Sequence, residues 1–380
     1  MGEHTHFDSL FQVGCHHLAR GLVQKGYQVT YLSTPLTPLH LANLFTSKRG
    51  ETLKRLKNWL AVGKTQMPGL FSYVPFSLFP FARLLPFDNS WTAWNNLKFT
   101  FPPLNGVIGK RGPFDLFLMG DPRFVPLMNE VGAKKNILRL TDNVLGFETT
   151  PRTMEGLIRY AIEHCDSVIV TARPLQKWLE KKFGFRDSIY IPNGVDFEHF
   201  NGTPEREPED LRTIPKPRAV YVGAMEKWFD LELLEAAAKG LPKVSFVLIG
   251  PPRIDLSGLA RFKNIHVLGP RPYGTIPANL KACQVGLIPF KNNELINSVS
   301  PIKLYEYMAC GLPVVSVEWE ELKGLKSPTY LTQDAPSFIR AIRKAMAAKS
   351  RKASYVRFAR RNSWDKRVDQ ILEVISRKTK

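Results

Sequence analysis

Short apolar strands that alternate with amphipathic helices are the pattern in this sequence that most restricts its fold. Stretches rich in valine, isoleucine and leucine recur in both halves and are separated by segments with helical spacing. The strand candidates are 29–33, 114–120, 137–140, 167–170 and 188–191 in the first half, and 219–222, 245–249, 265–268, 285–288 and 314–317 in the second. Strands that alternate with helices form parallel, doubly wound sheets. The sequence therefore predicts an α/β protein built on such sheets.

The length of the chain indicates two domains. A chain of 380 residues is too long for one ordinary hydrophobic core. A polar, proline-rich stretch at 198–217 is typical of a linker. We therefore predict a Rossmann-like domain over 1–197, the linker, a second Rossmann-like domain over 218–350, and a basic helical segment over 351–380.

The beginning of the chain departs from this pattern. Asp8 or Ser9 can cap a helix that runs to about Lys25. A doubly wound domain normally has a strand before its first helix, but residues 1–7 have no strand pattern. The sequence thus predicts either a sheet that lacks a strand or a true start upstream of Met1.

The composition indicates an anionic partner. Lysine and arginine number 53 against 34 acidic residues, which gives a formal net charge of +19. Such a charge suits nucleic acid, an acidic membrane surface or phosphorylated substrates, and by itself it does not choose among them. The four cysteines form no C-x-x-C pair, which is typical of reduced core residues in a cytosolic protein. No apolar run is long enough to span a membrane.

An insertion at about 47–100 combines basic and aromatic residues. Residues 47–64 have the spacing of an amphipathic helix, and the segment that follows is rich in phenylalanine, tryptophan and proline. Its basic residues are Lys48, Arg49, Lys54, Arg55, Lys57 and Lys64, and its apolar positions are Leu53, Leu56, Trp59 and Leu60. This composition is typical of an interfacial membrane binder. We predict a membrane-facing insertion, with a buried insertion that has a solvated basic face as the alternative.

The stretch 297–316 has the pattern of a loop, a helix and a strand. Ser298 and Ser300 lie in the polar loop, Pro301 suits the first helical turn, and Gly311 ends the helix. The N-terminus of a helix has unpaired N–H groups and a partial positive charge. A hydroxyl-rich loop that leads into it can therefore bind phosphate.

Two side chains on this helix extend the phosphate site toward a sugar. Lys303 adds a full positive charge on the first turn. Glu306 lies on roughly the same face and can accept hydrogen bonds from a pair of hydroxyl groups. Together they predict a site for a nucleotide diphosphate sugar.

The same stretch resembles the donor-site motif of the group 1 (family 4-like) glycosyltransferases. Glu306 and the run Met308-Ala-Cys-Gly-Leu-Pro-Val-Val315 match the motif, while Ser298 replaces the glutamate that the family has eight positions before Glu306. The run Ile191-Pro-Asn-Gly-Val-Asp196 resembles the connector between the family's domains. The resemblance implies a GT-B fold, in which two Rossmann-like domains face each other across a cleft. It also implies that the last helix crosses back to the N-terminal domain.

The resemblance implies a set of donor-binding residues in the second half. In the family an arginine and a lysine after a strand-end glycine hold the pyrophosphate, whereas here Gly223 is followed by Lys227 alone. Glycine turns such as that of Gly250, and the turn at Tyr273, are expected to border the nucleotide base. The predicted donor site consists of Gly223, Lys227, Gly250, Tyr273, Ser298, Val299, Ser300, Lys303 and Glu306.

Asp142 is the predicted catalytic residue. It follows a strand at the end where active sites of parallel sheets lie, and an inverting transferase needs a base for the acceptor hydroxyl. Many retaining relatives have a His-Asp pair in this region, whereas Thr141-Asp142 is similar to inverting enzymes such as the xanthan-type glucuronosyltransferase. Helix capping is the alternative role, and Asp121 is a second candidate base. Histidines cluster at positions 4, 6, 16 and 17, and we interpret one of them as a loop residue near the acceptor rather than a metal ligand.

These observations predict a metal-independent glycosyltransferase of the hexosyltransferase type that needs no cofactor. Its donor is a nucleotide diphosphate sugar, with UDP favoured, and its acceptor is a lipid-linked or cell-envelope glycan. The predicted location is the cytoplasm, at the inner face of the cell membrane. A GT-B-fold sugar-nucleotide epimerase would share the donor site and is the alternative. A nucleic-acid-binding protein would explain the charge, but the sequence has none of the motifs of such modules, so we predict no nucleic acid partner.

Overall fold

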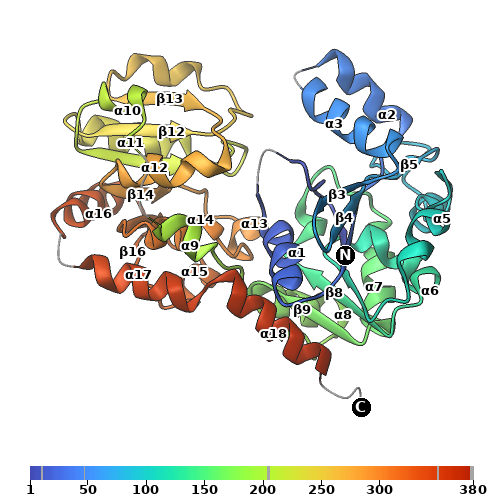
Figure 1. The fold of residues 1–380 in the computed structure, drawn as a ribbon. Helices are drawn as coiled ribbons and strands as arrows, with labels where there is room; N and C mark the ends of the chain where they lie inside the picture. Colours follow the sequence, from blue (N-terminus) through green and yellow to red (C-terminus); the bar gives the residue numbers. More distant parts are fainter. Residues whose placement is uncertain (10–11, 47, 203–205, 349–350, 377–380) are drawn as a thin grey trace. The chain divides into compact units, whose positions relative to one another are not determined.

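The computed structural model describes residues 1–9, 12–46, 48–202, 206–348 and 351–376. Contacts divide the chain into two compact units. Unit 1 consists of Met1–Pro192 and the chain from Arg367 onward, and unit 2 consists of Asn193–Lys366. Each unit contains a sheet flanked by helices (Figure 1).

The sheet of unit 1 has the strand order β10-β9-β8-β7-β1-β2-β4-β3, and only β3 is antiparallel to its neighbour among the described strands of that sheet. Its strands are β1 (Gly2–Glu3), β2 (Val29–Ser33), β3 (Lys64–Met67), β4 (Leu70–Tyr73), β7 (Leu116–Met119), β8 (Lys135–Leu140), β9 (Ser167–Val170) and β10 (Ile189–Tyr190). The short strands β5 (Phe76–Ser77) and β6 (Thr100–Phe101) pair separately. The helices are α1 (Gly14–Gln24), α2 (Pro38–Leu41), α3 (Arg49–Leu60), α4 (Ser90–Asn95), α5 (Leu104–Ile108), α6 (Met128–Val131), α7 (Met154–His164) and α8 (Arg173–Phe183). The strands predicted for this half are confirmed.

The strand that the sequence pattern did not show is present. β1 runs parallel to both β2 and β7, so the prediction of a sheet without this strand is wrong. Gly2 lies against a buried ring, because a Cβ there would be 2.4 Å from Cγ of Phe124. The pattern search failed because β1 contains glycine and glutamate instead of apolar residues.

Helix α1 begins later than predicted. Its first residue is Gly14, so neither Asp8 nor Ser9 caps it. The backbone N–H of Val13 donates to Nδ1 of His16 over 3.0 Å, and this bond satisfies an N–H at the start of the helix. A histidine ring thus has the role that the sequence assigned to an acidic or hydroxyl side chain.

Helix α3 turns a polar side toward the interior. Thr52 and Asn58 are buried, whereas Leu60 is 70% exposed. The Asn58 side chain donates to the carbonyl of Ser72 over 3.4 Å and accepts from the N–H of Val74 over 2.7 Å. These bonds fix the rotation of the helix about its axis. The predicted amphipathic helix exists, but its buried contacts with the sheet are largely polar.

The sheet of unit 2 is parallel throughout its described strands, in the order β13-β12-β11-β14-β15-β16. These are β11 (Arg218–Val222), β12 (Ser245–Ile249), β13 (Ile265–Gly269), β14 (Val285–Ile288), β15 (Val314–Val317) and β16 (Tyr330–Thr332). The helices are α9 (Phe197–Asn201), α10 (Glu209–Arg212), α11 (Leu231–Gly240), α12 (Ile276–Lys281), α13 (Glu294–Asn297), α14 (Ile302–Ala309), α15 (Glu320–Gly324), α16 (Ala335–Ala347) and α17 (Lys352–Arg361). Helix α18 (Trp364–Ser376) begins in this unit and belongs to unit 1 from Arg367 onward. The strands predicted for this half are confirmed.

The segment predicted as a linker, 198–217, belongs to unit 2 by its contacts. Phe200, Leu211 and Ile214 are buried in the core of that unit, because these apolar side chains lie between the polar residues that suggested a linker. The described residues of the basic segment 351–380 are mostly helical, in α17 and α18, as the sequence indicates. No helix in the described part of the chain is long and apolar enough to cross a membrane.

The orientation of α3 gives a first prediction. Asn58→Leu should lower the free energy of unfolding by about 2 kcal/mol, since it leaves the buried N–H of Val74 without its acceptor. The control Leu53→Gln on the same helix should change it by less than about 0.5 kcal/mol, because Leu53 is exposed. Urea unfolding followed by circular dichroism makes the comparison. A larger loss for Leu53→Gln would contradict this orientation.

Candidate functional site

The predicted phosphate-binding loop joins α13 to α14 in unit 2, and hydrogen bonds hold it from several sides. Ser298 and Ser300 are buried. The hydroxyl of Ser298 donates to a carbonyl of α13 over 3.1 Å, and the carbonyl of Ser300 accepts from the side chain of Asn193 over 2.9 Å. The indole N–H of Trp319 donates to the carbonyl of Val299 over 3.0 Å. The conformation of the loop is therefore fixed by its own unit.

Lys303 lies over a glycine at the carboxyl end of β11. Helix α14 begins at Ile302, with Pro301 as the preceding cap residue, so Lys303 is on the first turn as predicted. A Cβ on Gly223 would be 2.3 Å from Cε of Lys303, and a Cβ on Gly250 would be 2.0 Å from the carbonyl oxygen of Gly223. Both glycines have φ near +150°, a conformation that side chains disfavour. The two strand ends and the lysine can approach this closely only because both residues are glycine.

The charges of Lys303 and Glu306 are poorly hydrated. Burial lowers the pKa of Lys303, and the nearby Glu306 partly opposes this shift. Burial raises the pKa of Glu306 to about 7; Lys303 acts to lower it and Asp196 to raise it further. Both side chains keep part of their surface accessible. A cation and a carboxyl group thus lie in a site where a ligand with a matching anion and hydroxyl groups would replace lost water.

Two other predicted donor residues lie elsewhere on unit 2. Lys227 is exposed in the loop that follows β11. The ring of Tyr273 stacks on His199 of α9 with centroids 4.6 Å apart. The structure therefore brings together Gly223, Gly250 and Lys303. Tyr273 packs against α9, and Lys227 lies at the surface.

Sequence reasoning missed the residues that position α14. The hydroxyl of Tyr307 accepts from the N–H of Val222 over 2.8 Å, and a Cβ on Gly286 would be 2.3 Å from the Tyr307 ring. The helix is thereby held against β11 and β14, one turn beyond Lys303. Asn193 lies in the run 191–196, which resembles the connector between the family's domains. The sequence of that run did not predict the hydrogen bond from Asn193 to the loop. Tyr307 gave no signal, since its position in the helix is equally typical of an ordinary core residue.

In unit 1, Asp142 follows β8 and has no capping role among the described bonds. The hydroxyl of Thr141 donates to its Oδ2 over 3.0 Å. The short helix that follows begins after Asn143 and has no side-chain cap. Burial raises the pKa of Asp142, while the Thr141 bond and the positive charge of Arg139 act in the opposite direction. A raised pKa suits a carboxylate that accepts a proton from a hydroxyl group.

The second candidate, Asp121, is engaged in structure. Its Oδ1 accepts from the backbone N–H of Arg123 over 2.9 Å at the start of a 3-10 helix. Its Oδ2 is 2.6 Å from the guanidinium of the same arginine. The charge and hydrogen bonds of Arg123 lower the pKa of Asp121, against its burial. This carboxylate is therefore a cap and an ion-pair partner, and a poor base.

Two residues at the end of β1, Glu3 in the strand and His4 directly after it, were not predicted as site residues. Glu3 is 2% exposed, and burial raises its pKa to about 8 despite the nearby Arg139. His4 keeps much of its surface accessible, and Asp121 and Asp142 both act electrostatically on it. Because β1 lies next to β7, which pairs with β8, this edge of the sheet gathers His4 and the two aspartates. No group of three or more histidine, cysteine or acidic side chains could hold a metal ion in the described ranges.

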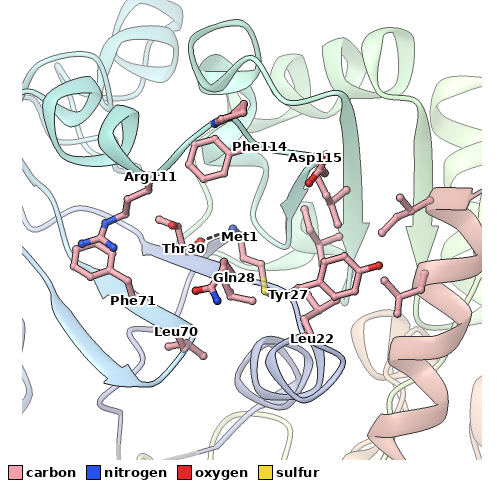
Figure 2. A pocket seen from close by; sticks show the side chains of 18 of the residues that line it. Met1, Leu22, Tyr27, Gln28, Thr30, Leu70, Phe71, Arg111, Phe114 and Asp115 are labelled. Atoms are coloured by element: carbon pink, nitrogen blue, oxygen red, sulfur yellow. Dashed lines mark hydrogen bonds between the residues drawn. The ribbon is translucent and has the colours of Figure 1, made fainter.

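The hollows of about 650 Å³ in each unit lie away from these residues. The one in unit 1 is lined by Val29, Leu70 and Leu116, the first residues of β2, β4 and β7, whereas Asp142 follows the carboxyl end of β8. Figure 2 shows this pocket, with Tyr27, Leu22 and Leu70 around it and Arg111 over the ring of Phe71. The hollow in unit 2 is lined by residues at the end of α14, including Cys310 and Gly311, whereas Lys303 is at its beginning.

The raised pKa of Glu306 gives a prediction about stability. In the folded chain Glu306 keeps its proton up to about pH 7, whereas in the unfolded chain it loses the proton near the ordinary pKa of 4.5. The free energy of unfolding therefore falls as the pH rises from about 4.5 to about 7. Glu306→Gln should therefore raise the free energy of unfolding by about 1–3 kcal/mol at pH 8 and by little at pH 4.5. The exposed control Glu294→Gln should show no such dependence. Urea unfolding at a series of pH values makes the measurement, and a gain that falls as pH rises would contradict the burial of the charge.

The sequence is similar to a glycosyltransferase family model and to a curated bacterial protein. Residues 216–348 match the family model described as Glycosyl transferases group 1. A segment of 198 residues is 25% identical to the putative teichuronic acid biosynthesis glycosyltransferase TuaH of Bacillus subtilis (strain 168). This match covers 49% of the chain and 49% of the relative, so it spans about half the length of each.

Solved structures resemble the chain over almost its whole length. Sucrose-phosphate synthase from Thermosynechococcus elongatus has a TM-score of 0.71 and 16% identity, with 98% of this chain and 97% of that one covered. HepE from Anabaena, solved in complex with UDP and glucose, has a TM-score of 0.65 and 16% identity, with 99% of each chain covered. At such low identity the likeness shows the fold alone. The chain therefore has the GT-B fold, and its residues 216–348 are similar to the group 1 glycosyltransferase family.

Proposed function

We propose that the chain is a glycosyltransferase that moves a sugar from a UDP-sugar to a glycan acceptor. The observation that supports this most directly is the position of Lys303 over Gly223, with the Glu306 carboxyl group one turn further along α14. The cation suits a diphosphate, and the carboxyl group suits a pair of sugar hydroxyls. UDP is the favoured nucleotide because HepE, which shares the fold, binds UDP and glucose.

The donor contacts in this proposal follow the geometry of unit 2. Lys303 and the loop at Ser298, Val299 and Ser300 receive the diphosphate, and Glu306 receives the sugar. The N–H groups of Ser298 and Val299 donate to carbonyls of α13 over 3.3 and 3.0 Å, so the N–H of Ser300 is the one that we assign to the phosphate. Gly223 and Gly250, at the ends of β11 and β12, allow the close approach that places the Lys303 cation at these strand ends. The proposal also includes Lys227, whose exposed side chain would reach the pyrophosphate, and Tyr273, which would border the base.

The chemistry assigned to the site is an inverting displacement. The oxygen of the acceptor hydroxyl bonds to the anomeric carbon of the donor, its proton passes to the carboxylate of Asp142, and the bond between that carbon and the diphosphate oxygen breaks. UDP leaves with the bonding electron pair, and Lys303 with the N–H group of Ser300 stabilises its charge. This hexosyl transfer would need neither a metal ion nor a cofactor, since protein groups supply the positive charge.

The acceptor in this proposal is a lipid-linked or cell-envelope polysaccharide. The relative TuaH is named for teichuronic acid biosynthesis, and the net charge of +19 favours anionic partners such as phosphorylated acceptors. A lipid-linked acceptor is presented at a membrane. We therefore place the enzyme in the cytoplasm, held peripherally at the inner face of the cell membrane.

Calorimetry with UDP tests the donor site. Lys303→Ala should weaken UDP binding by about tenfold or more, since a charge-assisted contact to phosphate is lost. Lys243→Ala, which removes an exposed lysine beyond α11, should bind UDP as the unchanged chain does. Normal UDP affinity in Lys303→Ala would refute this donor site. If UDP and GDP both fail to bind while short single-stranded DNA binds tightly in a salt-sensitive manner, the chain is a nucleic-acid binder instead.

Turnover tests the base. Asp142→Asn should bind UDP normally but release UDP from UDP-sugars about a hundredfold more slowly, because general base catalysis is lost. A panel of UDP-sugars with water as the acceptor supplies the assay, which measures free UDP. The exposed Asp187→Asn serves as the matched control in the same unit. Unimpaired release by Asp142→Asn would exclude this residue as the base, and conversion of the UDP-sugar to its epimer without release of UDP would identify an epimerase.

A further inference from the structure

Exposed large apolar side chains concentrate in one section of unit 1. This section is residues 39–101, and among the described residues Tyr27 and Val267 are the exposed large apolar residues outside it. Those within it are Leu39, Leu41, Phe45, Leu53, Leu60, Val62, Leu78, Leu84, Leu85, Trp91, Phe99 and Phe101. We call this set the 39–101 surface. Phe45 is 91% exposed and Leu85 is 85% exposed, which is unusual for side chains of this size in a folded unit.

The elements that carry these residues adjoin one another. Helices α2 and α3 lie together beside β5 (Figure 1). The indole N–H of Trp59, in the last turn of α3, donates to the carbonyl of Phe101. Phe101 is in β6, which pairs with β5. Leu78 directly follows β5, and its backbone N–H donates to the carbonyl of Phe99 over 3.3 Å. Trp91 of α4 stacks on Phe99 with ring centroids 5.6 Å apart. A continuous series of contacts therefore runs from α3 through β5 and β6 to α4.

The polar anchoring of α3 keeps its leucines outside. The helix cannot rotate to bury Leu53 and Leu60 without breaking the bonds of Asn58 to β4 and to Val74. It would also break the bond that the Arg55 guanidinium donates to the carbonyl of Thr34 over 2.8 Å. Because buried polar groups need their partners, the fold itself holds the apolar side of α3 toward solvent.

The charge around the 39–101 surface is strongly positive. Within residues 39–101 the basic side chains are Lys48, Arg49, Lys54, Arg55, Lys57, Lys64, Arg83 and Lys98, against Glu51 and Asp88. Lys48, Arg49 and Lys57 are exposed and form no ion pair with any part of the chain that the structure describes. Exposed lysines beside exposed leucines and phenylalanines match the two layers of an anionic bilayer, its headgroups and its acyl chains.

We propose that the 39–101 surface binds an anionic phospholipid bilayer. The apolar side chains enter the boundary between headgroups and acyl chains, and the lysines of α3 contact the lipid phosphates. Nucleic acid fits less well, because most of the exposed apolar side chains are aliphatic and do not stack on bases. The inference deepens the peripheral membrane attachment of the proposed function, because it assigns that attachment to one surface of unit 1. It does not depend on the donor site of unit 2.

Vesicle binding tests this surface on the full chain. Sedimentation with vesicles of phosphatidylcholine that contain about a third phosphatidylglycerol should show binding that vesicles of pure phosphatidylcholine lack. Replacing three exposed residues, Phe45→Ser, Leu60→Ser and Phe101→Ser together, should reduce the bound fraction at least about tenfold. The charge variant Lys54→Glu with Lys57→Glu should reduce it similarly and remove its salt dependence.

Matched controls separate this inference from instability and from the proposed function. Val267→Ser and Lys243→Glu change an exposed apolar residue and an exposed lysine on unit 2, and should leave vesicle binding unchanged. Circular dichroism and urea unfolding should show that every one of these variants is folded. UDP affinity, which concerns unit 2, should be the same in all of them. Equal vesicle binding by the triple variant and the unchanged chain would overturn the proposal. The proposal would also be overturned if the unchanged chain bound no vesicles and formed a dimer, and the triple variant did not form that dimer.

Discussion

The close approach of Lys303 to Gly223 is the contact on which the candidate site in unit 2 depends. It requires two strand ends without side chains, since a Cβ at Gly223 would meet the lysine and a Cβ at Gly250 would meet the Gly223 carbonyl. It also requires a helix that cannot shift, and the bond between Tyr307 and Val222 supplies that restraint. The Lys303 cation is thus placed by backbone geometry rather than by an ion pair in the described structure.

Unit 1 is organised by buried polar contacts in a comparable way. The N–H of Val74 and the carbonyl of Ser72 are satisfied by Asn58, and this requirement decides which side of α3 faces the sheet. At the carboxyl edge of the same sheet, Glu3 and Arg139 are both 2% exposed and lie close enough to affect each other's pKa. Apolar burial holds the layers together, but these polar groups determine what remains at the surface and in the site.

The sequence predicted the features that depend on local pattern. Five of the six described strands of unit 2 follow from continuous apolar runs, because a parallel strand is buried on both faces. β1 could not be predicted, since Gly2 and Glu3 owe their place to neighbours far along the chain, Phe124 and Arg139. The same reason explains why the rotation of α3 was not predicted. Within the candidate site, the motif indicated Lys303. The loop and α14 are held in place by contacts between residues far apart in the sequence, and no local pattern encodes such contacts.

The basic residues of the chain lie in two physically different environments, one buried and one exposed to solvent. Lys303 is surrounded by protein and its pKa is lowered, so its charge costs free energy that a bound anion would offset. Lys48, Arg49 and Lys57 are hydrated at the surface, where their interactions with an anionic surface are long-range and weakened by salt. Added salt should therefore weaken attachment through the surface lysines more than nucleotide binding at Lys303, because ions screen exposed charges far better than buried ones.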